Sequence, residues 1–235
     1  FEAHKKFLEK LSVALGKDLQ KIYASSKPKG KFSPDAKSAG LRSLRNGALT
    51  LLSFRGETSD YQRIVEHFKE SSSMTDQAHA LNLIASLDIP ERLECLSIFY
   101  DRWQNDHLVI DLWFAAQAQS SLSDTLERVR TLTKHPLFNY ATPNKVRALI
   151  GTFATQNALQ FNRPDGAGYA FVAEQVLKID AINPQVAARL LGSFKSWGAL
   201  EKKRKTKARE ALSFVAKQKG ISRDLYEIVS KMLES

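Results

Sequence analysis

Apolar residues recur at spacings of three and four along most of the chain, and this period limits the fold more than any other feature. One such face comprises Phe7, Leu8, Leu11, Leu15, Leu19 and Ile22. That spacing places side chains on one side of an α-helix, whereas a half-buried strand would alternate every second residue. Because no stretch shows a convincing strand alternation, we predict an all-α fold.

Helix-start signals divide the chain into about twelve short helices joined by short loops. We expect starts at Ser33-Pro34, Ser59-Asp60, Thr75-Asp76, Pro90, Leu108, Asp124, Pro143, Ala167, Pro184, Leu200 and Ser222. Serine, threonine and aspartate accept hydrogen bonds from free backbone N–H groups at a helix start, and proline fits the first turn. With 11 Gly and 7 Pro in 235 residues, the chain also has few of the turn residues that a β-sandwich or barrel needs.

The same spacing predicts which side chains form the core. The expected inward positions are Ile64, Val65, Phe68, Leu81, Ile84, Leu87, Leu93, Leu96, Ile98, Phe99, Trp113, Phe114, Leu126, Val129 and Leu132. Cys95 falls among them, and we interpret it as a small core residue.

A weak internal repeat indicates how the helices are arranged. The nine residues that begin at Pro143 (PNKVRALIG) resemble the nine that begin at Pro184 (PQVAARLLG), at an offset of 41 residues. Two-helix solenoid repeats have periods of roughly 40–47 residues. We therefore predict one domain over residues 1–235, a superhelical solenoid of paired short helices of the HEAT or armadillo type.

The net charge of +10 is concentrated in two segments. Residues 1–50 carry 11 Lys or Arg against four Asp or Glu, and residues 195–220 carry nine against two. The densest run lies within residues 202–209. A basic run can bind a phosphate backbone, but no aromatic residue that could stack on bases interleaves with this one, so we interpret it as a solvated helix face. Lys27, Lys29 and Lys31 are expected to lie in an exposed loop.

Several kinds of catalytic site find no support in the sequence. No histidine is followed by Glu, so the His-Glu-x-x-His zinc helix is absent. The nearest approach to a ligand cluster is His67 beside Glu66 and Glu70, and we interpret His67 as a surface residue of an amphipathic helix, because only one helix supplies candidate ligands. The one Gly-x-Gly, at Gly166 and Gly168, follows no strand and is expected to form a tight turn rather than a dinucleotide site. We therefore assign no catalytic residue and no metal ligand to this chain.

The cellular setting follows from two further features. No apolar run approaches the roughly 18 residues that span a bilayer, so no membrane partner is expected. A single cysteine excludes an internal disulfide and fits a reducing compartment, and we expect a cytoplasmic location.

Two arginines near helix starts are the remaining candidates for a binding role. Arg147 follows Pro143 by four residues and Arg189 follows Pro184 by five. Equivalent solenoid helices present their first turns on one edge, where two guanidinium groups could bind carboxylates or backbone carbonyls. The one-residue difference rotates one side chain by about 100°. An ordinary ion pair or a carbonyl-capping role is the alternative.

Several short motifs carry a resemblance to a known family. The most specific are Pro143-Asn144-Lys145-Val146-Arg147 and Asn183-Pro184-Gln185-Val186-Ala187; the others are Leu44-Arg45-Asn46, Met74-Thr75-Asp76, and the segments 99–104, 108–114 and 165–169. Over about residues 40–235, the chain resembles the C-terminal helical domain of bacterial-type aminopeptidase N, a family of zinc metallopeptidases. The segment 161–165 (FNRPD) departs from the family's usual histidine-containing version.

The resemblance implies a specific function. It implies an enzyme that uses one zinc ion to remove N-terminal residues from peptides, with the zinc held by a catalytic domain that this segment lacks. The C-terminal domain would close over the active site and bound the substrate cavity, and Arg147 and Arg189 match arginines that face that cavity. The implied partners are the catalytic domain of the same chain and peptide substrates, and the segment alone is expected to be inactive and free of cofactor.

Two other functions stay open from the residues alone. One is a free-standing helical-repeat scaffold for protein interactions. The other, less favoured, is a nucleic-acid-binding module that uses the basic segments; its affinity would fall steeply with salt.

Overall fold

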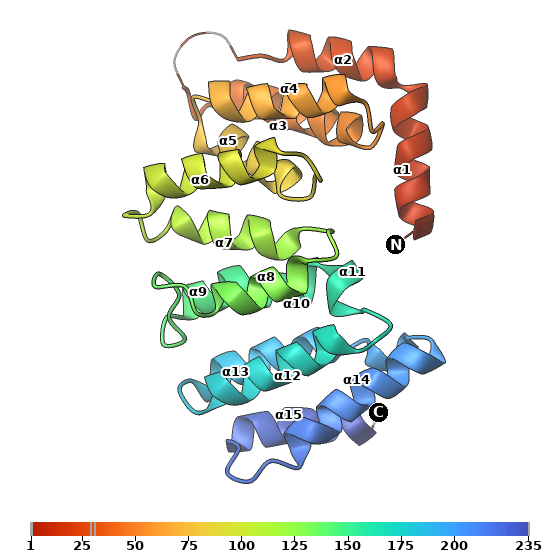
Figure 1. Cartoon of the computed structure of the whole chain (residues 1–235), viewed down its shortest axis with the longest axis vertical. Coiled ribbons are helices and arrows are strands. Elements are labelled where there is room, and N and C mark those ends of the chain that lie inside the picture. The colour runs from red at the N-terminus through yellow and green to blue at the C-terminus, as the bar shows by residue number, and fades with distance from the viewer. Residues whose placement is uncertain (1, 29, 31, 235) are drawn as a thin grey trace. The chain divides into compact units, whose positions relative to one another are not determined.

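Every regular element that the structure contains is helical. The computed structural model describes residues 2–28, 30 and 32–234, and none of these forms a strand. The all-α prediction is therefore confirmed (Figure 1). Lys29 and Lys31, two of the three lysines expected in an exposed loop, lie outside the described residues; Lys27 is exposed, as expected.

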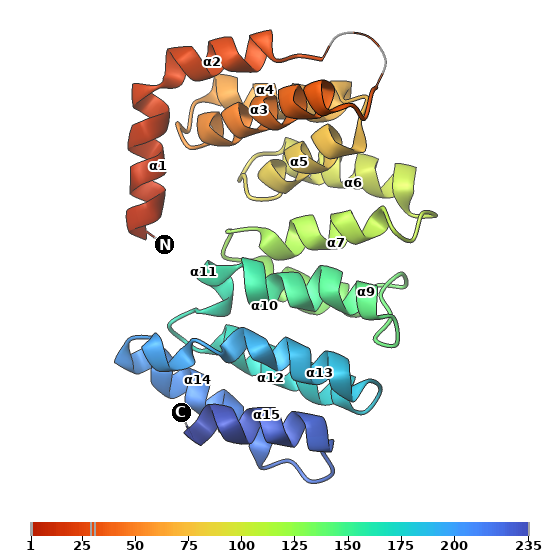
Figure 2. The same ribbon diagram turned by 180° about the vertical axis from the view of Figure 1, so that it is seen from behind.

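The first of two compact units comprises Phe1–Ala116. Its helices are α1 (Glu2–Ala14), α2 (Gly16–Ser25), α3 (Ala36–Ser53), α4 (Thr58–Glu70), α5 (Met74–Ile84), α6 (Glu91–Trp103) and the first part of α7 (Ile110–Gln119). Helix α2 packs on α3, α3 and α4 both pack on α5, and α5 packs on α6 (Figures 1 and 2). Each helix thus lies against its near neighbours in sequence.

The second unit comprises Gln117–Ser235. Its helices are α8 (Thr125–Leu132), α9 (Pro143–Val146), the π-helix η1 (Arg147–Gly151), α10 (Thr152–Gln156), α11 (Ala158–Phe161), α12 (Ala167–Asp180), α13 (Pro184–Leu191), the 3₁₀ turns η2 (Gly192–Phe194) and η3 (Trp197–Ala199), α14 (Lys202–Ala216) and α15 (Arg223–Glu234). Helix α12 packs on α13 and α14, and α15 packs on the same two helices.

Packing between sequence neighbours is the arrangement of a solenoid, in which each repeat contacts only the repeats beside it. The fold class is therefore the predicted one, an all-α solenoid of paired helices. The boundary between the two compact units falls within α7. That residues 1–235 act as one domain stays a prediction. No helix in the described part of the chain is both long and apolar enough to cross a bilayer.

Most of the predicted core positions are buried. Ile64, Phe68, Leu81, Phe99 and Phe114 are all fully enclosed, and the predicted positions of α8 are buried as well. Leu93 is an error of the prediction, because its side chain is 67% exposed. The buried stripe of α6 runs through Cys95, Leu96 and Phe99, and Leu93 lies two residues before Cys95, about 200° around the helix.

The continuous apolar face predicted for residues 7–22 is also wrong. The chain turns at Leu15, between α1 and α2, so the face is divided between two helices that point in different directions. Leu19 is buried in the second helix, whereas Phe7 is 61% exposed in the first. Gly16 begins α2 beside the Arg55 side chain, where a Cβ would come within 2.7 Å of Nη1.

The predicted helix starts lie close to the observed ones, with small shifts that the capping geometry explains. Helix α3 begins at Ala36 rather than beside Ser33, because the Asp35 side chain accepts a hydrogen bond from the Ser38 backbone N–H at 2.9 Å. Ser33 instead donates its hydroxyl proton to the Asp35 carboxylate. Pro143 and Pro184 each occupy the first turn of their helices, as predicted.

Candidate functional site

The segment that carries Arg147 contains an irregular helical turn. Helix α9 passes into the π-helix η1 at Arg147 and returns to α-helical geometry at Thr152. The Thr152 hydroxyl donates to the Arg147 carbonyl oxygen at 3.2 Å, five residues back. A π-turn takes in more residues than an α-turn, and such turns are frequent at functional sites. Arg147 therefore begins a π-turn rather than a regular α-helical turn.

Arg189 comes from the last turn of α13. The helix begins where the Asn183 side chain accepts a hydrogen bond from the Val186 backbone N–H at 3.1 Å, with Pro184 in the first turn. Gln185 and Arg189 are four residues apart, so both project from the same face. The cap thereby sets which side of α13 carries the guanidinium group.

A groove with a volume of about 510 Å³ brings the two arginines together. Arg147 and Arg189 both line it, along with the polar side chains of Thr152, Thr155, Gln156, Asn183 and Gln185. No acidic side chain is among the described residues that line the groove. The surface therefore combines two permanent positive charges with neutral hydrogen-bonding groups, a composition suited to carboxylates and carbonyls.

The two guanidinium groups are available for a ligand. The Arg147 Nη1 donates to Asn144 Oδ1 at 3.0 Å within its own helix, and Arg147 is otherwise exposed. Arg189 is also exposed, and its guanidinium group has no hydrogen bond or ion pair with any residue that the structure describes. The ion-pair alternative therefore does not apply to Arg189 within those residues.

The 100° rotation expected from the unequal spacing does not separate the two arginines. The rotation argument treats the two helices as copies with the same backbone geometry, but Arg147 lies at a π-turn, and both arginines line one groove. Sequence reasoning missed Thr152, Thr155 and Gln156, which also line the groove. Their short distance in sequence after Arg147, within three helical turns, was the feature that could have identified them as neighbours of that side chain.

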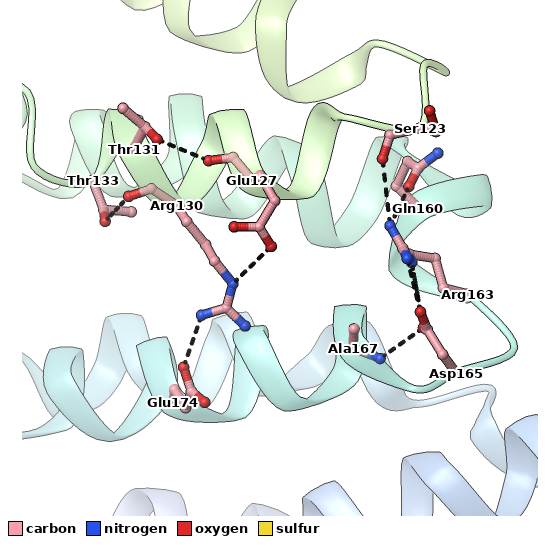
Figure 3. A network of polar contacts seen from close by, with 10 residues as sticks. All are labelled: Ser123, Glu127, Arg130, Thr131, Thr133, Gln160, Arg163, Asp165, Ala167 and Glu174. Atoms are coloured by element: carbon pink, nitrogen blue, oxygen red, sulfur yellow. Dashed lines mark hydrogen bonds and ion pairs between the residues drawn. The ribbon is translucent and has the colours of Figure 1, made fainter.

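A polar network stabilises the segment 161–165, in which the sequence differs from the histidine-containing version of the family. The Arg163 Nη2 donates to Asp165 at 2.7 Å, and Asp165 accepts the backbone N–H of Ala167 at 3.0 Å, at the start of α12 (Figure 3). In the same view, Arg130 lies 3.2 Å from Glu174 and bridges α8 to α12. Neither Arg130 nor Arg163 lines the groove, so this network positions α12 rather than a ligand.

The Gly-x-Gly segment forms the predicted tight turn. Gly166 is the residue before α12 and has φ of 79°, a left-handed conformation that glycine adopts at little cost. Gly168 lies in the first turn of α12, packed directly on the carbonyl oxygens of Gln160 and Phe161. Gly166 thus forms the turn before α12, and Gly168 allows α12 to pack closely on α11.

The basic run extends along α14, where several of its cations contact neighbouring groups. The Arg204 Nε donates to the Asn162 carbonyl oxygen at 2.6 Å, and the Lys207 Nζ donates to Glu210 at 2.8 Å. Lys205 donates to the Gly198 carbonyl and lies 5.6 Å from the Trp197 ring centroid. These contacts support the interpretation of the run as a helix face, which stays a prediction.

The described residues contain neither a metal-ligand cluster nor an activated cysteine. No group of three or more His, Cys, Asp or Glu side chains within them could hold a metal ion. Cys95 is buried, and burial raises the pKa of its thiol to about 11. The thiol is therefore protonated near neutral pH and is a poor nucleophile.

Comparisons with known proteins agree on one relationship. A family described as "Domain of unknown function (DUF3458_C) ARM repeats" matches residues 1–234. The chain is 36% identical to an aminopeptidase N of Caulobacter vibrioides and 35% identical to one of Escherichia coli, in each case over 95% of this chain and 26% of the relative. The chain thus spans about a quarter of the length of these relatives.

A solved structure shares the fold. The crystal structure of a Legionella pneumophila aminopeptidase A in complex with aspartic acid matches 99% of this chain and 28% of that protein, with a TM-score of 0.89 and 27% sequence identity. Both kinds of comparison therefore match this chain to one part of a larger peptidase.

Proposed function

Since the chain belongs to the DUF3458_C family of ARM-repeat domains and is a C-terminal domain of aminopeptidase N, we propose that it is the non-catalytic domain of a zinc enzyme that removes N-terminal residues from peptides. The observation that carries this proposal is the groove in which Arg147 and Arg189 meet, with no acidic side chain among the described residues that line it. Peptides present carboxylates and carbonyls, which guanidinium groups bind in two-point fashion.

The proposed partner is the catalytic portion of the same chain. Its existence is supported by the relatives, of which this chain matches 26%. In this proposal the domain closes over the active site, bounds the substrate cavity and presents the groove to the far end of a bound peptide. We place the enzyme in the cytoplasm, a proposal supported by the single, buried Cys95.

The zinc ion would be held outside this domain. The described residues do not fit a zinc site, since no three ligand side chains converge in them. The contribution of this domain is therefore to binding, through hydrogen bonds from Arg147, Arg189 and the neutral side chains between them.

Replacement of Arg147 or Arg189 by Ala in the full-length enzyme should weaken the binding of tri- and tetrapeptides. Loss of a charge-assisted hydrogen bond costs on the order of 1.5–3 kcal/mol, which raises the Michaelis constant roughly ten-fold or more. Turnover should change less, because these groups would lie far from the scissile bond. The measurement is steady-state kinetics on peptides and on single-residue chromogenic substrates, which are too short to reach the groove.

Arg209→Ala serves as the matched control, because Arg209 is an exposed arginine of α14 outside the groove. It should leave both substrate classes unchanged. If Arg147→Ala and Arg189→Ala affected short and long substrates equally, the groove would not bind peptide and the two arginines would have a structural role.

The isolated 235-residue chain should hydrolyse no aminoacyl substrate and retain no stoichiometric zinc. The reason is that zinc sites require at least three converging protein ligands. Elemental analysis of the purified chain and a chromogenic aminopeptidase assay test both points. Stoichiometric zinc together with chelator-sensitive activity would contradict the assignment of catalysis to another part of the enzyme.

A further inference from the structure

Helix α1 contacts the rest of its unit along one narrow side. It packs on α3 and α2, and Ser12 is the one buried residue among its 13. Leu8, one turn before Ser12, is half-buried. An isolated helix of about 12–15 residues is only marginally stable in water, and most helices in proteins are stabilised by packing of an apolar face. The contacts within the unit therefore use little of the apolar surface of α1.

A second apolar side of α1 is exposed. We call it the exposed stripe, and it consists of four residues at spacings of four, four and three: Ala3, Phe7, Leu11 and Ala14. This spacing places them side by side along the helix. Ala3 and Ala14 are exposed, Leu11 is half-buried, and Phe7 is 61% exposed. A single exposed apolar residue is common, whereas a stripe with the helical period is typical of a face that packs against another element.

The exposed side of α15 has a different composition. Its residues Leu225 and Val229 are buried, and its exposed side carries the ion pair between Arg223 and Glu227 at 3.0 Å. Tyr226 is the one large apolar side chain exposed among the described residues of α15. A solenoid helix that faces water needs such a polar side. Helix α1 lacks it along the exposed stripe, which indicates that α1 is covered in the full-length protein.

The order of packing in the chain indicates what covers α1. In each unit, helices pack against helices near them in sequence, as in solenoids generally. Helices α2 and α3, which follow α1, already occupy its other side. Because the chain is a C-terminal domain that matches 26% of the aminopeptidase N relatives, most of such an enzyme precedes it and is joined to α1. A segment joined to α1 has a high effective concentration beside the exposed stripe, which favours it over a separate protein.

We propose that the exposed stripe is the docking face for the segment of the full-length chain that directly precedes residue 1, and that this segment supplies an amphipathic helix that continues the solenoid. Phe7 is the central apolar contact of this interface. The short side chains of Ala3 and Ala14 allow the axis of the docked helix to come close to that of α1. The proposal rests on the proposed function only in that the chain is part of a larger enzyme, and it concerns a surface outside the arginine groove.

The first test is photo-crosslinking in the full-length enzyme, with p-benzoylphenylalanine in place of Phe7. We expect crosslinked peptides that join position 7 to the segment before residue 1, in a product that migrates as a single chain. Val13 is the matched control position, because it lies in the same helix and is 68% exposed, yet is six residues from Phe7 and so about 120° around the helix. The same probe at position 13 should give no such peptide.

The second test needs no probe. Alanine is a better helix former than phenylalanine or valine, so Phe7→Ala and Val13→Ala should each be neutral or stabilising if the side chain faces water. If Phe7 is docked, Phe7→Ala removes a buried side chain and should shorten the half-life of thermal inactivation of the full-length enzyme roughly ten-fold. Val13→Ala should leave that half-life unchanged.

Two results would overturn the proposal. Crosslinks from position 7 to a second copy, seen as a product of twice the mass, would make the exposed stripe a dimer face. The absence of crosslinks together with an unchanged half-life for Phe7→Ala would leave the stripe in water. Aminopeptidase activity of the unsubstituted enzyme separates the two proposals. An active enzyme without the crosslink rejects the docking face alone, and an inactive enzyme with the crosslink rejects the proposed function alone.

Discussion

Replacement of Asp60 by Ala should lower the free energy of unfolding of this chain by about 3–5 kcal/mol. Asp60 is fully buried near the start of α4, where its carboxylate contacts two arginines. The Arg55 Nε donates to Oδ2 at 2.6 Å, and Arg63 donates to Oδ1. The side chain of Arg55 is only 9% exposed, so removal of the carboxylate leaves a buried guanidinium group whose remaining ion-pair partner is the half-exposed Glu57, 3.0 Å from Nη2.

The measurement is urea denaturation followed by far-ultraviolet circular dichroism. Asp18→Ala is the matched control in the same unit, because Asp18 also pairs with a cation, Lys21, but its side chain is 69% exposed. Exposed ion pairs contribute about 0–1 kcal/mol. Equal losses for the two variants would show that the contribution of the Asp60 ion pair does not depend on burial.

Replacement of Gly168 by Ala should destabilise the second unit by about 3 kcal/mol, at the upper end of the cost of overpacking. A Cβ at this position would lie 2.3 Å from the Phe161 carbonyl oxygen and 2.4 Å from that of Gln160. Both contacts are with backbone, so no side-chain rotation can relieve them. Helix α12 would have to move away from α11.

Gly192→Ala is the control for Gly168→Ala. Gly192 has φ of −54°, and no described atom beyond its own neighbours lies within 4 Å of the place that a Cβ would take, so the substitution should be neutral or stabilise by about 0.4–1 kcal/mol. Thermal and urea denaturation of both variants give the comparison. Similar stability for the two would mean that α11 and α12 are not in close contact at Gly168.

Local features of the sequence were sufficient to predict the helices. The period of three and four, the capping residues and the prolines at first turns act within a few residues of the chain. For this reason the start of α13 at Pro184 and the burial of Phe99 and Phe114 followed directly from the pattern. The division of residues 7–22 into two helices did not, because each helix separately satisfies the same spacing.

The binding features depend on contacts between residues far apart in the chain. Arg147 and Arg189 could be identified as candidates from their position after proline, but only the packing of their helices places both in one groove. The spacing argument predicted a rotation between them, because it could not include the π-turn at Arg147.

The buried polar side chains around His67 show the same division, since His67 contacts Tyr23, and Tyr23 accepts a hydrogen bond from Arg45. Arg45 entered the sequence analysis only within the motif Leu44-Arg45-Asn46, and the interpretation of His67 as a surface residue is wrong, because its side chain is only 2% exposed. The sequence by itself determined the helices, because periodicity and caps are local interactions. Only the tertiary structure decided which polar groups are buried together and which lack partners among the described residues, because burial and hydrogen bonding between distant segments depend on how helices pack.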